Sequence, residues 1–309
     1  MKKLMWIGCF LLTLAVWARG YVPIFDGASV KLLLTVVDDY GNPVDHAEMD
    51  VVFQVSDERT QVEKGFTDNE GNLRVAGLTI RNVNVWVKKA GFYESHVTIN
   101  ARKCSYEEAV RSRMWAKDEL HETITLRRQY APIRLTAHSL LYKEYPAVNE
   151  VLKLDLETLA WCPPYGNGRH DDVHMVFDGW HNPDDPLNFY EHLTLTFPHC
   201  ADGFYRRTID ATSAFPYDYV AQTNQAFEKT LALRFARERM GITNRVELAA
   251  DEYLIYRVRT QTNEQGVVTS AHYGRIGEKM SHLLRLTMRS WFNPTENDPN
   301  LEDCNLSCQ

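Results

Sequence analysis

The sequence predicts a mainly β protein of two domains, and three observations support that fold class. Apolar and polar residues alternate over many short stretches, which is the period of a half-buried strand. Turn-forming residues separate these stretches at short, regular intervals, as in a β-sandwich. The 309 residues exceed the usual size of one domain, roughly 100–200 residues, and suffice for two, each with its own core.

The N-terminus has the pattern of a secretory signal peptide. Lys2 and Lys3 precede an unbroken apolar run over 4–17, and small residues follow at which cleavage can occur. The alternative is a membrane anchor, but crossing a bilayer takes roughly 20 apolar residues, and this run is shorter and ends at Arg19. We therefore expect a signal peptide at 1–20, a periplasmic or extracellular destination, and no transmembrane segment once the leader is removed.

The formal net charge of the chain is −7 at pH 7. Nucleic acids and anionic lipids attract proteins with clustered Lys and Arg. The charge therefore argues against nucleic acid as a partner.

Five cysteines follow the predicted leader, and an oxidising compartment favours their pairing. Cys304 and Cys308 are close enough in sequence to close a small C-terminal loop. Cys162 and Cys200 could bridge two strands of the second domain, which leaves Cys104 over. The alternative is that all five thiols are reduced, since sequence alone does not fix the connectivity.

The first domain is expected at 21–128 and reads as short strands joined by turns. Alternation over 49–55 is typical of a half-buried strand, and Gly41 and Gly71 lie in turns where positive φ is needed. Ser105 and Glu108 fit a capping box and predict one short helix inserted before the last strand. The other expected strands are 30–37, 73–75, 83–88 and 123–126.

Three segments of this domain carry a family resemblance: VVDDYGNPVDHAEMDV at 36–51, GFTDNEGNLRV at 65–75 and VWVKKAGFYESHVTI at 85–99. In order and spacing they resemble the carboxypeptidase regulatory-like pattern of strands and glycine turns. The resemblance implies a seven-stranded sandwich related to transthyretin-like, Ig-like folds. Such domains are usually accessory, spacer or adhesion modules, so the resemblance implies no catalysis here.

The second domain is expected at 129–309 as another antiparallel β-sandwich. The clearest hairpin alternates over 253–260, turns at 263–266 and returns through 267–273. The stretch 230–240 also has good helix propensity, so a helix is the alternative there. The nine expected strands are 133–141, 151–156, 173–177, 193–197, 205–209, 230–235, 253–260, 267–273 and 283–291.

This half is similar to the C-terminal region of uncharacterised exported bacterial proteins in which a carboxypeptidase regulatory-like domain precedes a β-rich domain of unknown function. The segments that carry the similarity are LDLETLAWCPPYGNGRHDDVHMVF, LTLTFPHCADGF, YRVRTQTNEQGVVTSAHYGRI and WFNPTENDPNLE. The similarity implies the domain order and an exported destination, and it implies no activity.

His170, His174 and His192 are the candidate metal ligands. His170-x-x-x-His174 beside two aspartates would place both imidazoles on one face of a helix, as in zinc hydrolases. On a strand, however, residues four apart lie about 13 Å from each other, too far to share one ion. His174 and His192 could instead face each other from neighbouring strands. A hydrogen-bonded surface cluster is the alternative interpretation of all five histidines between 170 and 199.

Trp180 and Tyr165 are the candidate ligand-binding residues. Trp180 belongs to an acidic, proline-containing stretch, 178–186, that we expect to form a loop. An exposed Trp can stack on sugar, and carboxylates in an extracellular loop can hold calcium. The alternative is an ordinary solvated turn, since the spaced ligand pattern of a calcium loop is missing.

Taken together, the sequence predicts an exported protein with a non-enzymatic structural or ligand-binding role. Carbohydrate binding is the most concrete version, with a polysaccharide or an envelope component as partner. No catalytic residue and no cofactor is predicted, because no nucleophile elbow, P-loop or dinucleotide fingerprint is present. The alternative is a hydrolase, metal-dependent through His170 and His174 or acid/base through carboxylates that the sequence does not identify.

Overall fold

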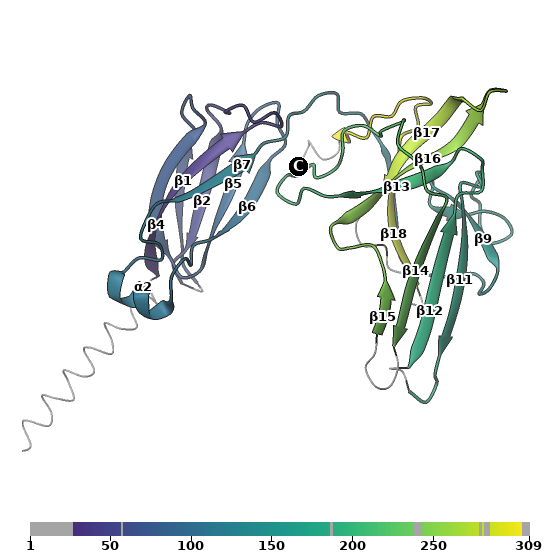
Figure 1. Ribbon diagram of the computed structural model, residues 1–309, viewed down its shortest axis with the longest axis horizontal. Coiled ribbons are helices and arrows are strands. Elements are labelled where there is room, and N and C mark those ends of the chain that lie inside the picture. The colour runs from purple at the N-terminus through teal and green to yellow at the C-terminus, as the bar shows by residue number, and fades with distance from the viewer. Residues whose placement is uncertain are drawn as a thin grey trace, which may run out of the picture. The chain divides into compact units, whose positions relative to one another are not determined.

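The computed structural model describes residues 27–56, 58–185, 188–237, 243–277, 280 and 285–304 (Figure 1). The chain forms two compact units, of which unit 1 comprises Met1–Tyr130 with Thr212–Phe215, and unit 2 comprises Ala131–Ala211 with Pro216–Gln309. The predicted signal peptide at 1–20 lies outside the described residues. The described residues contain no helix that could span a bilayer.

Unit 1 is a β-sandwich whose described residues form seven strands in two sheets. The three-stranded sheet has the order β4-β1-β7, and β1 pairs antiparallel with β4 and parallel with β7. The four-stranded sheet is antiparallel with the order β3-β2-β5-β6. The strands are β1 (Ala28–Val37), β2 (Glu48–Gln54), β3 (Thr60–Phe66), β4 (Asn72–Thr79), β5 (Asn82–Lys88), β6 (Ser95–Asn100) and β7 (Leu120–Thr125).

The core of unit 1 comes from the inward residues of these strands. Leu32 and Leu34 of β1 are fully buried and face Val51 and Phe53 of β2 across the sandwich. Each such side chain stabilises the fold by about 1.5–3 kcal/mol on burial. The alternation of apolar and polar residues in the sequence therefore has the expected cause: one side chain in two along each of these strands is buried.

The inserted helix is confirmed as α2 (Tyr106–Ser112), the one helix among the described residues. Ser105 is its N-cap, and the hydroxyl accepts a hydrogen bond from the Glu108 amide at 3.3 Å. The helix ends at Arg113, which adopts the left-handed conformation with φ 61° and donates its amide to Ala109. The N-cap lies where the sequence pattern predicts it.

A four-residue segment from much later in the chain, Thr212–Phe215, is part of unit 1. It extends the sheet at β6, because Ser213 bridges to Ser95 and the His96 amide donates to the Thr212 carbonyl at 2.8 Å. The ring of Phe215 stacks on Tyr93 with centroids 4.9 Å apart. The sequence gives no sign of this segment, because four residues are too few to show a period of their own.

Unit 2 is a sandwich of two antiparallel sheets. One has the order β10-β9-β11-β12-β14-β15 and the other β13-β16-β17-β18-β8. Leu193 and Leu231 of the first sheet share a core with Tyr256 and Met288 of the second. The strands are β8 (Thr136–Glu144), β9 (Val151–Asp155), β10 (Ala160–Trp161), β11 (Val173–His181), β12 (Phe189–Thr196), β13 (Gly203–Thr208), β14 (Thr230–Arg237), β15 (Thr243–Val246), β16 (Glu252–Thr262), β17 (Val268–Ile276) and β18 (Arg285–Phe292).

All nine strands expected in unit 2 are present, and the mainly β class is confirmed. The helical alternative at 230–240 is wrong over 230–237, which form β14 with alternate residues such as Leu231 and Leu233 buried, and 238–240 lie outside the described residues. The strands that the sequence did not predict individually are β3, β6, β10 and β15. β3 escaped because it buries no apolar side chain: its two large apolar residues, Val62 and Phe66, are exposed.

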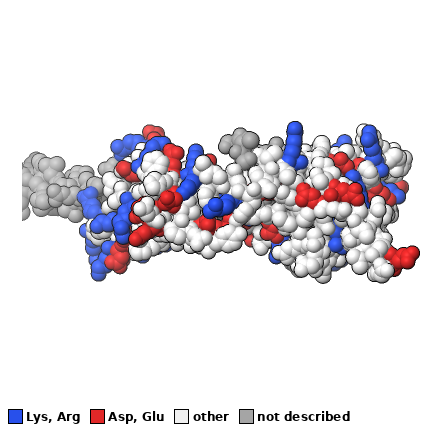
Figure 2. All heavy atoms as spheres, turned by 90° about the horizontal axis from the view of Figure 1, so that it is seen from above, with Lys and Arg blue, Asp and Glu red and all other residues white. Residues whose placement is uncertain are grey.

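Basic and acidic side chains lie interspersed on the face of the molecule seen in Figure 2. The mixing agrees with the modest net charge of −7 for 309 residues.

Gly41 and Gly71 provide a matched test of the turn geometry in unit 1. Both have positive φ, 80° and 78°, which costs a residue with a Cβ about 1–2 kcal/mol. A Cβ at Gly41 would meet nothing within 4 Å, whereas one at Gly71 would lie 2.5 Å from the Val36 carbonyl oxygen. Gly71→Ala should therefore destabilise the protein by about 3 kcal/mol or more and Gly41→Ala by about 1 kcal/mol. Chemical denaturation measures both, and equal losses would contradict the close approach.

Candidate functional site

The most connected polar group in unit 2 surrounds Arg259 of β16. Its guanidinium donates to Glu157 at 2.7 Å, to Asp155 at 3.2 Å and to both oxygens of Asp172 at 3.0 Å. Asp155 and Asp172 are each only 1% exposed. Because Arg259 belongs to the five-stranded sheet and Asp155 ends β9 of the other sheet, this ion-pair cluster joins the two sheets.

A β-bulge explains why Arg259 reaches the interior. Val258 points into the core, so strict alternation along β16 would turn the next residue, Arg259, toward the outside. The pairing of β16 with β17 shifts register between Val258 and Gln261, and Arg259 has φ 56°. The fully buried carboxylate of Asp202 accepts hydrogen bonds from the backbone amides of Arg259 and Thr260 and so holds this conformation. The guanidinium then lies over the Phe292 ring, 4.6 Å from its centroid.

The pKa values of Asp172, Asp155 and Arg259 are shifted in different ways because their surroundings differ. Burial raises the pKa of Asp172, against the opposing effect of Arg259. Burial also acts to raise the pKa of Asp155, but hydrogen bonds from backbone amides and the charge of Arg259 outweigh it, so that this pKa lies below its usual value. Burial acts to lower the pKa of Arg259, and its carboxylate partners overcome that effect and raise it. The guanidinium therefore stays charged.

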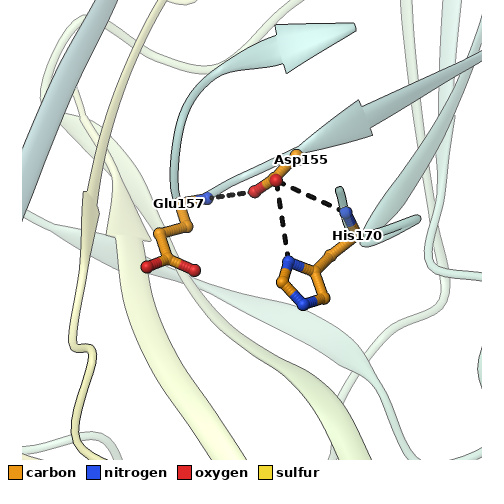
Figure 3. A group of neighbouring side chains, drawn as sticks. All are labelled: Asp155, Glu157 and His170. Atoms are coloured by element: carbon orange, nitrogen blue, oxygen red, sulfur yellow. Dashed lines mark hydrogen bonds and ion pairs between the residues drawn. The ribbon is translucent and has the colours of Figure 1, made fainter. Parts of the chain in front are cut away.

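Asp155, Glu157 and His170 bring one ligand atom each within 4.8 Å of one another, a spacing that a metal ion could use (Figure 3). The oxygens of Asp155 are already occupied, however. One accepts from the Glu157 and Thr158 amides and from Arg259, and the other accepts from the Arg169 and His170 amides. A cation would have to displace these donors, so the contacts are those of a structural cluster around Arg259.

The predicted metal ligands have different partners. His170 lies 3.6 Å from Asp155, whereas His174 pairs with Asp171 at 2.8 Å. Val173–His181 is a strand, as expected, so the helical arrangement of a zinc hydrolase is not formed. The idea that His174 and His192 face each other is wrong, because His174 is opposite Thr196 in the register of β11 and β12. Metal binding by these residues stays a prediction.

The remaining histidines of the 170–199 stretch also have their own contacts. His192 is opposite Asp178 and lies 3.4 Å from the Thr194 hydroxyl. His181 contacts the buried Glu191 carboxylate at 2.7 Å, and His199 contacts the Asp171 carbonyl at 3.2 Å.

Trp180 lies in β11 and not in the loop that the sequence suggested. Outward residues of β11, β12 and β14 form a surface that we call the outer face: Asp178, Trp180, Tyr190, His192, Arg234 and Ala236. Trp180 is opposite Tyr190, which is opposite Ala236, and Asp178, His192 and Arg234 form the next row across the same strands. Figure 1 shows these three strands side by side.

The indole of Trp180 is 53% exposed and makes no hydrogen bond or ring contact with another described residue. Tyr190 beside it is half-buried, and its ring lies 6.4 Å from that of His192 at a 47° tilt. A large ring on a strand normally packs against its cross-strand neighbours. The outer face therefore offers one open aromatic surface with polar groups in the adjacent row.

Tyr165 is 37% exposed and lies elsewhere in unit 2, in the turn after β10. Its hydroxyl donates to Glu150 at 2.5 Å, and this bond raises the pKa of the phenol. None of the contacts among the described residues joins it to Trp180. The two candidate ligand-binding residues are therefore not brought together.

The predicted bridge between Cys162 and Cys200 is not formed, because both thiols are free. Cys162 is buried and its thiol donates to the His170 carbonyl at 3.2 Å, whereas Cys200 is exposed. Burial raises the pKa of Cys162, which makes its thiol less reactive. Cys308 lies outside the described residues, so its pairing with Cys304 stays a prediction.

Removal of the Arg259 charge should weaken unit 2 strongly. Arg259→Gln leaves three carboxylates together with no cation, so we expect a loss of about 3 kcal/mol in unfolding free energy. Arg289→Gln is the matched control, since Arg289 is exposed on β18 of the same sheet, and it should change stability by less than about 0.5 kcal/mol. Adding Asp172→Asn to Arg259→Gln should recover part of the loss. Equal denaturation midpoints for the two single variants would contradict the structural role.

The depressed pKa of Asp155 predicts an acid-sensitive contribution to stability. A carboxyl whose folded pKa is lowered stabilises the fold above its unfolded value, about 3.9, and loses that contribution as pH falls through the folded value. Asp155→Asn should therefore flatten the fall in melting temperature below about pH 4. Asp251→Asn, at an exposed position of the same unit, should leave the profile of the parent protein unchanged. A profile for Asp155→Asn that parallels the parent would refute the assignment.

No protein-family model and no curated protein matches the chain. Among solved structures it is similar to 3-chlorocatechol 1,2-dioxygenase from Rhodococcus opacus 1CP, with 12% identity over 33% of this chain and 61% of that one, and a TM-score of 0.26. It is also similar to a streptococcal ancillary pilin, with 10% identity over 90% of this chain and 62% of that one, and a TM-score of 0.24. A Bacteroides uniformis protein for which carbohydrate binding has been suggested gives 8% identity over 88% and 100% of the two chains, with a TM-score of 0.23. The chain thus spans less than two thirds of the dioxygenase and of the pilin, and scores this low support no argument about function.

Proposed function

We propose that this is an exported, non-enzymatic protein that binds carbohydrate on the outer face of unit 2. The observation that carries the proposal is the open indole of Trp180, 53% exposed beside Tyr190 on a regular sheet. An exposed aromatic ring of this size has a cost in water that a bound ligand would remove.

The chemistry of the outer face suits a sugar ring. One side of a pyranose carries C–H groups that pack on an aromatic ring, while its hydroxyls need hydrogen-bond partners at the edge. Trp180 and Tyr190 would provide the ring contact. Asp178, His192 and Arg234, two residues further along the same strands, would provide hydrogen-bond acceptors and donors.

Unit 1 fits the role of an accessory module. Its seven strands in sheets of three and four agree with the number implied by the carboxypeptidase regulatory-like resemblance, and we propose that it belongs to that group of domains. With the predicted signal peptide, this supports a location outside the cytoplasm, in the periplasm or beyond the cell. An envelope polysaccharide is the partner that agrees with this location and with the proposed binding face of unit 2.

The hydrolase alternative has less support. It would draw on His170 and on carboxylates such as Asp155 and Asp172. Both carboxylates are already engaged by Arg259 and by backbone amides, and the His170 ring lies 3.6 Å from Asp155. His174 has a different carboxylate partner, so the two histidines do not form a pair.

Substitution at Trp180 tests the proposal. Trp180→Ala should reduce binding to polysaccharide by about tenfold or more, since stacking and burial of an indole contribute about 1.5–3 kcal/mol. Tyr142→Ala is the matched control, because Tyr142 is an aromatic residue of unit 2 that is 73% exposed on the other sheet. A glycan array followed by affinity electrophoresis gives the measurement, with melting curves to show that both variants are folded.

The proposal fails if the parent protein binds no polysaccharide, or if Trp180→Ala binds as well as Tyr142→Ala.

A further inference from the structure

Arg234 is an exposed cation on the outer face with no ion pair among the described residues. Two other basic residues of the six-stranded sheet, Lys153 and Arg245, differ in this respect. Lys153 binds Asp171 at 2.7 Å, and Arg245 pairs with Glu247. Arg234 projects from β14 between two alanines, Ala232 and Ala236, so that no large side chain on its own strand covers the guanidinium.

The register places this guanidinium next to the aromatic surface. Arg234 is directly opposite His192, and Tyr190 is directly opposite Ala236, two residues further along β14. Arg234 and Tyr190 are therefore diagonal neighbours, at a backbone separation of about 7–8 Å. A side chain as long as arginine easily covers that distance, so one sugar ring over Tyr190 and Trp180 could reach the guanidinium with a substituent.

We infer that the ligand is a polysaccharide containing uronic acid, whose carboxylate binds Arg234 while its ring packs on Trp180 and Tyr190. This inference rests on the proposed carbohydrate function and adds the class of sugar. A carboxylate matches the planar fork of N–H donors on a guanidinium and forms two parallel charge-assisted hydrogen bonds with it.

The one acidic residue of the outer face is placed so that it can contribute to the same complex. Asp178 is in the same row as Arg234 but two strands away, about 10 Å at the backbone, with His192 between them. It lies on β11 two residues before Trp180, on the same side of the strand. There it accepts hydrogen bonds from hydroxyls at the edge of the stacked ring that points away from the carboxylate.

The experiment compares acidic and neutral polymers on the full chain. Affinity electrophoresis is run in gels containing polygalacturonate, alginate, fully methyl-esterified pectin or galactomannan, with dextran sulfate as a general polyanion. We expect retention by at least one uronate polymer to be about tenfold stronger than by esterified pectin or galactomannan, and to weaken when NaCl is raised. Arg234→Gln should remove this preference, whereas Arg289→Gln, an exposed arginine on the other sheet, should keep it.

The outcomes separate this inference from the proposed function. If the parent protein binds neutral and acidic polymers equally and Trp180→Ala abolishes both, the uronate inference is wrong and carbohydrate binding stands. Retention by dextran sulfate as strong as by the best uronate polymer, or loss of the preference in Arg289→Gln, would reduce the effect to general charge attraction and also overturn it. Absence of retention by every polymer would overturn the proposed function together with the inference.

Discussion

The ion-pair cluster around Arg259 is the constraint on which unit 2 depends. The guanidinium leaves the five-stranded sheet at a bulge and binds carboxylates at the end of β9 and before β11 of the six-stranded sheet. Buried charges are costly unless each has partners, and here every carboxylate has a cation or backbone amides as donors. An apolar core alone tolerates sliding of one sheet on the other, whereas directional bonds at this point fix how the two sheets face each other.

The sequence predicted the sandwich well because alternation has a direct physical cause. Strands such as β1 and β2 bury every second residue, and their apolar spacing is visible without any partner. β3 was missed because its inward residues include Gln61, Glu63 and Gly65, so its pattern carries no apolar period. β3 is a strand because it pairs with β2, and its own composition does not favour that structure.

The candidate site was less predictable because it depends on contacts between distant residues. Arg259 lies 87 and 104 positions from Asp172 and Asp155, and the bulge that turns it inward breaks the alternation that the sequence shows. Trp180 was recognised as a candidate but assigned to a loop, because Gly179 and the prolines that follow are typical of turns. A signal for the cluster did exist: acidic residues at 155 and 172 stand beside strongly apolar stretches, and buried acids of that kind require a basic partner.

The outer face has a consequence for how such proteins can diverge. Its residues occupy the alternate positions of β11, β12 and β14, whereas the other positions of the same strands carry the core. Substitutions at the outward positions therefore leave interior packing unchanged. If the outer face binds a ligand as proposed, its preference can change over evolutionary time while the scaffold beneath it keeps its shape.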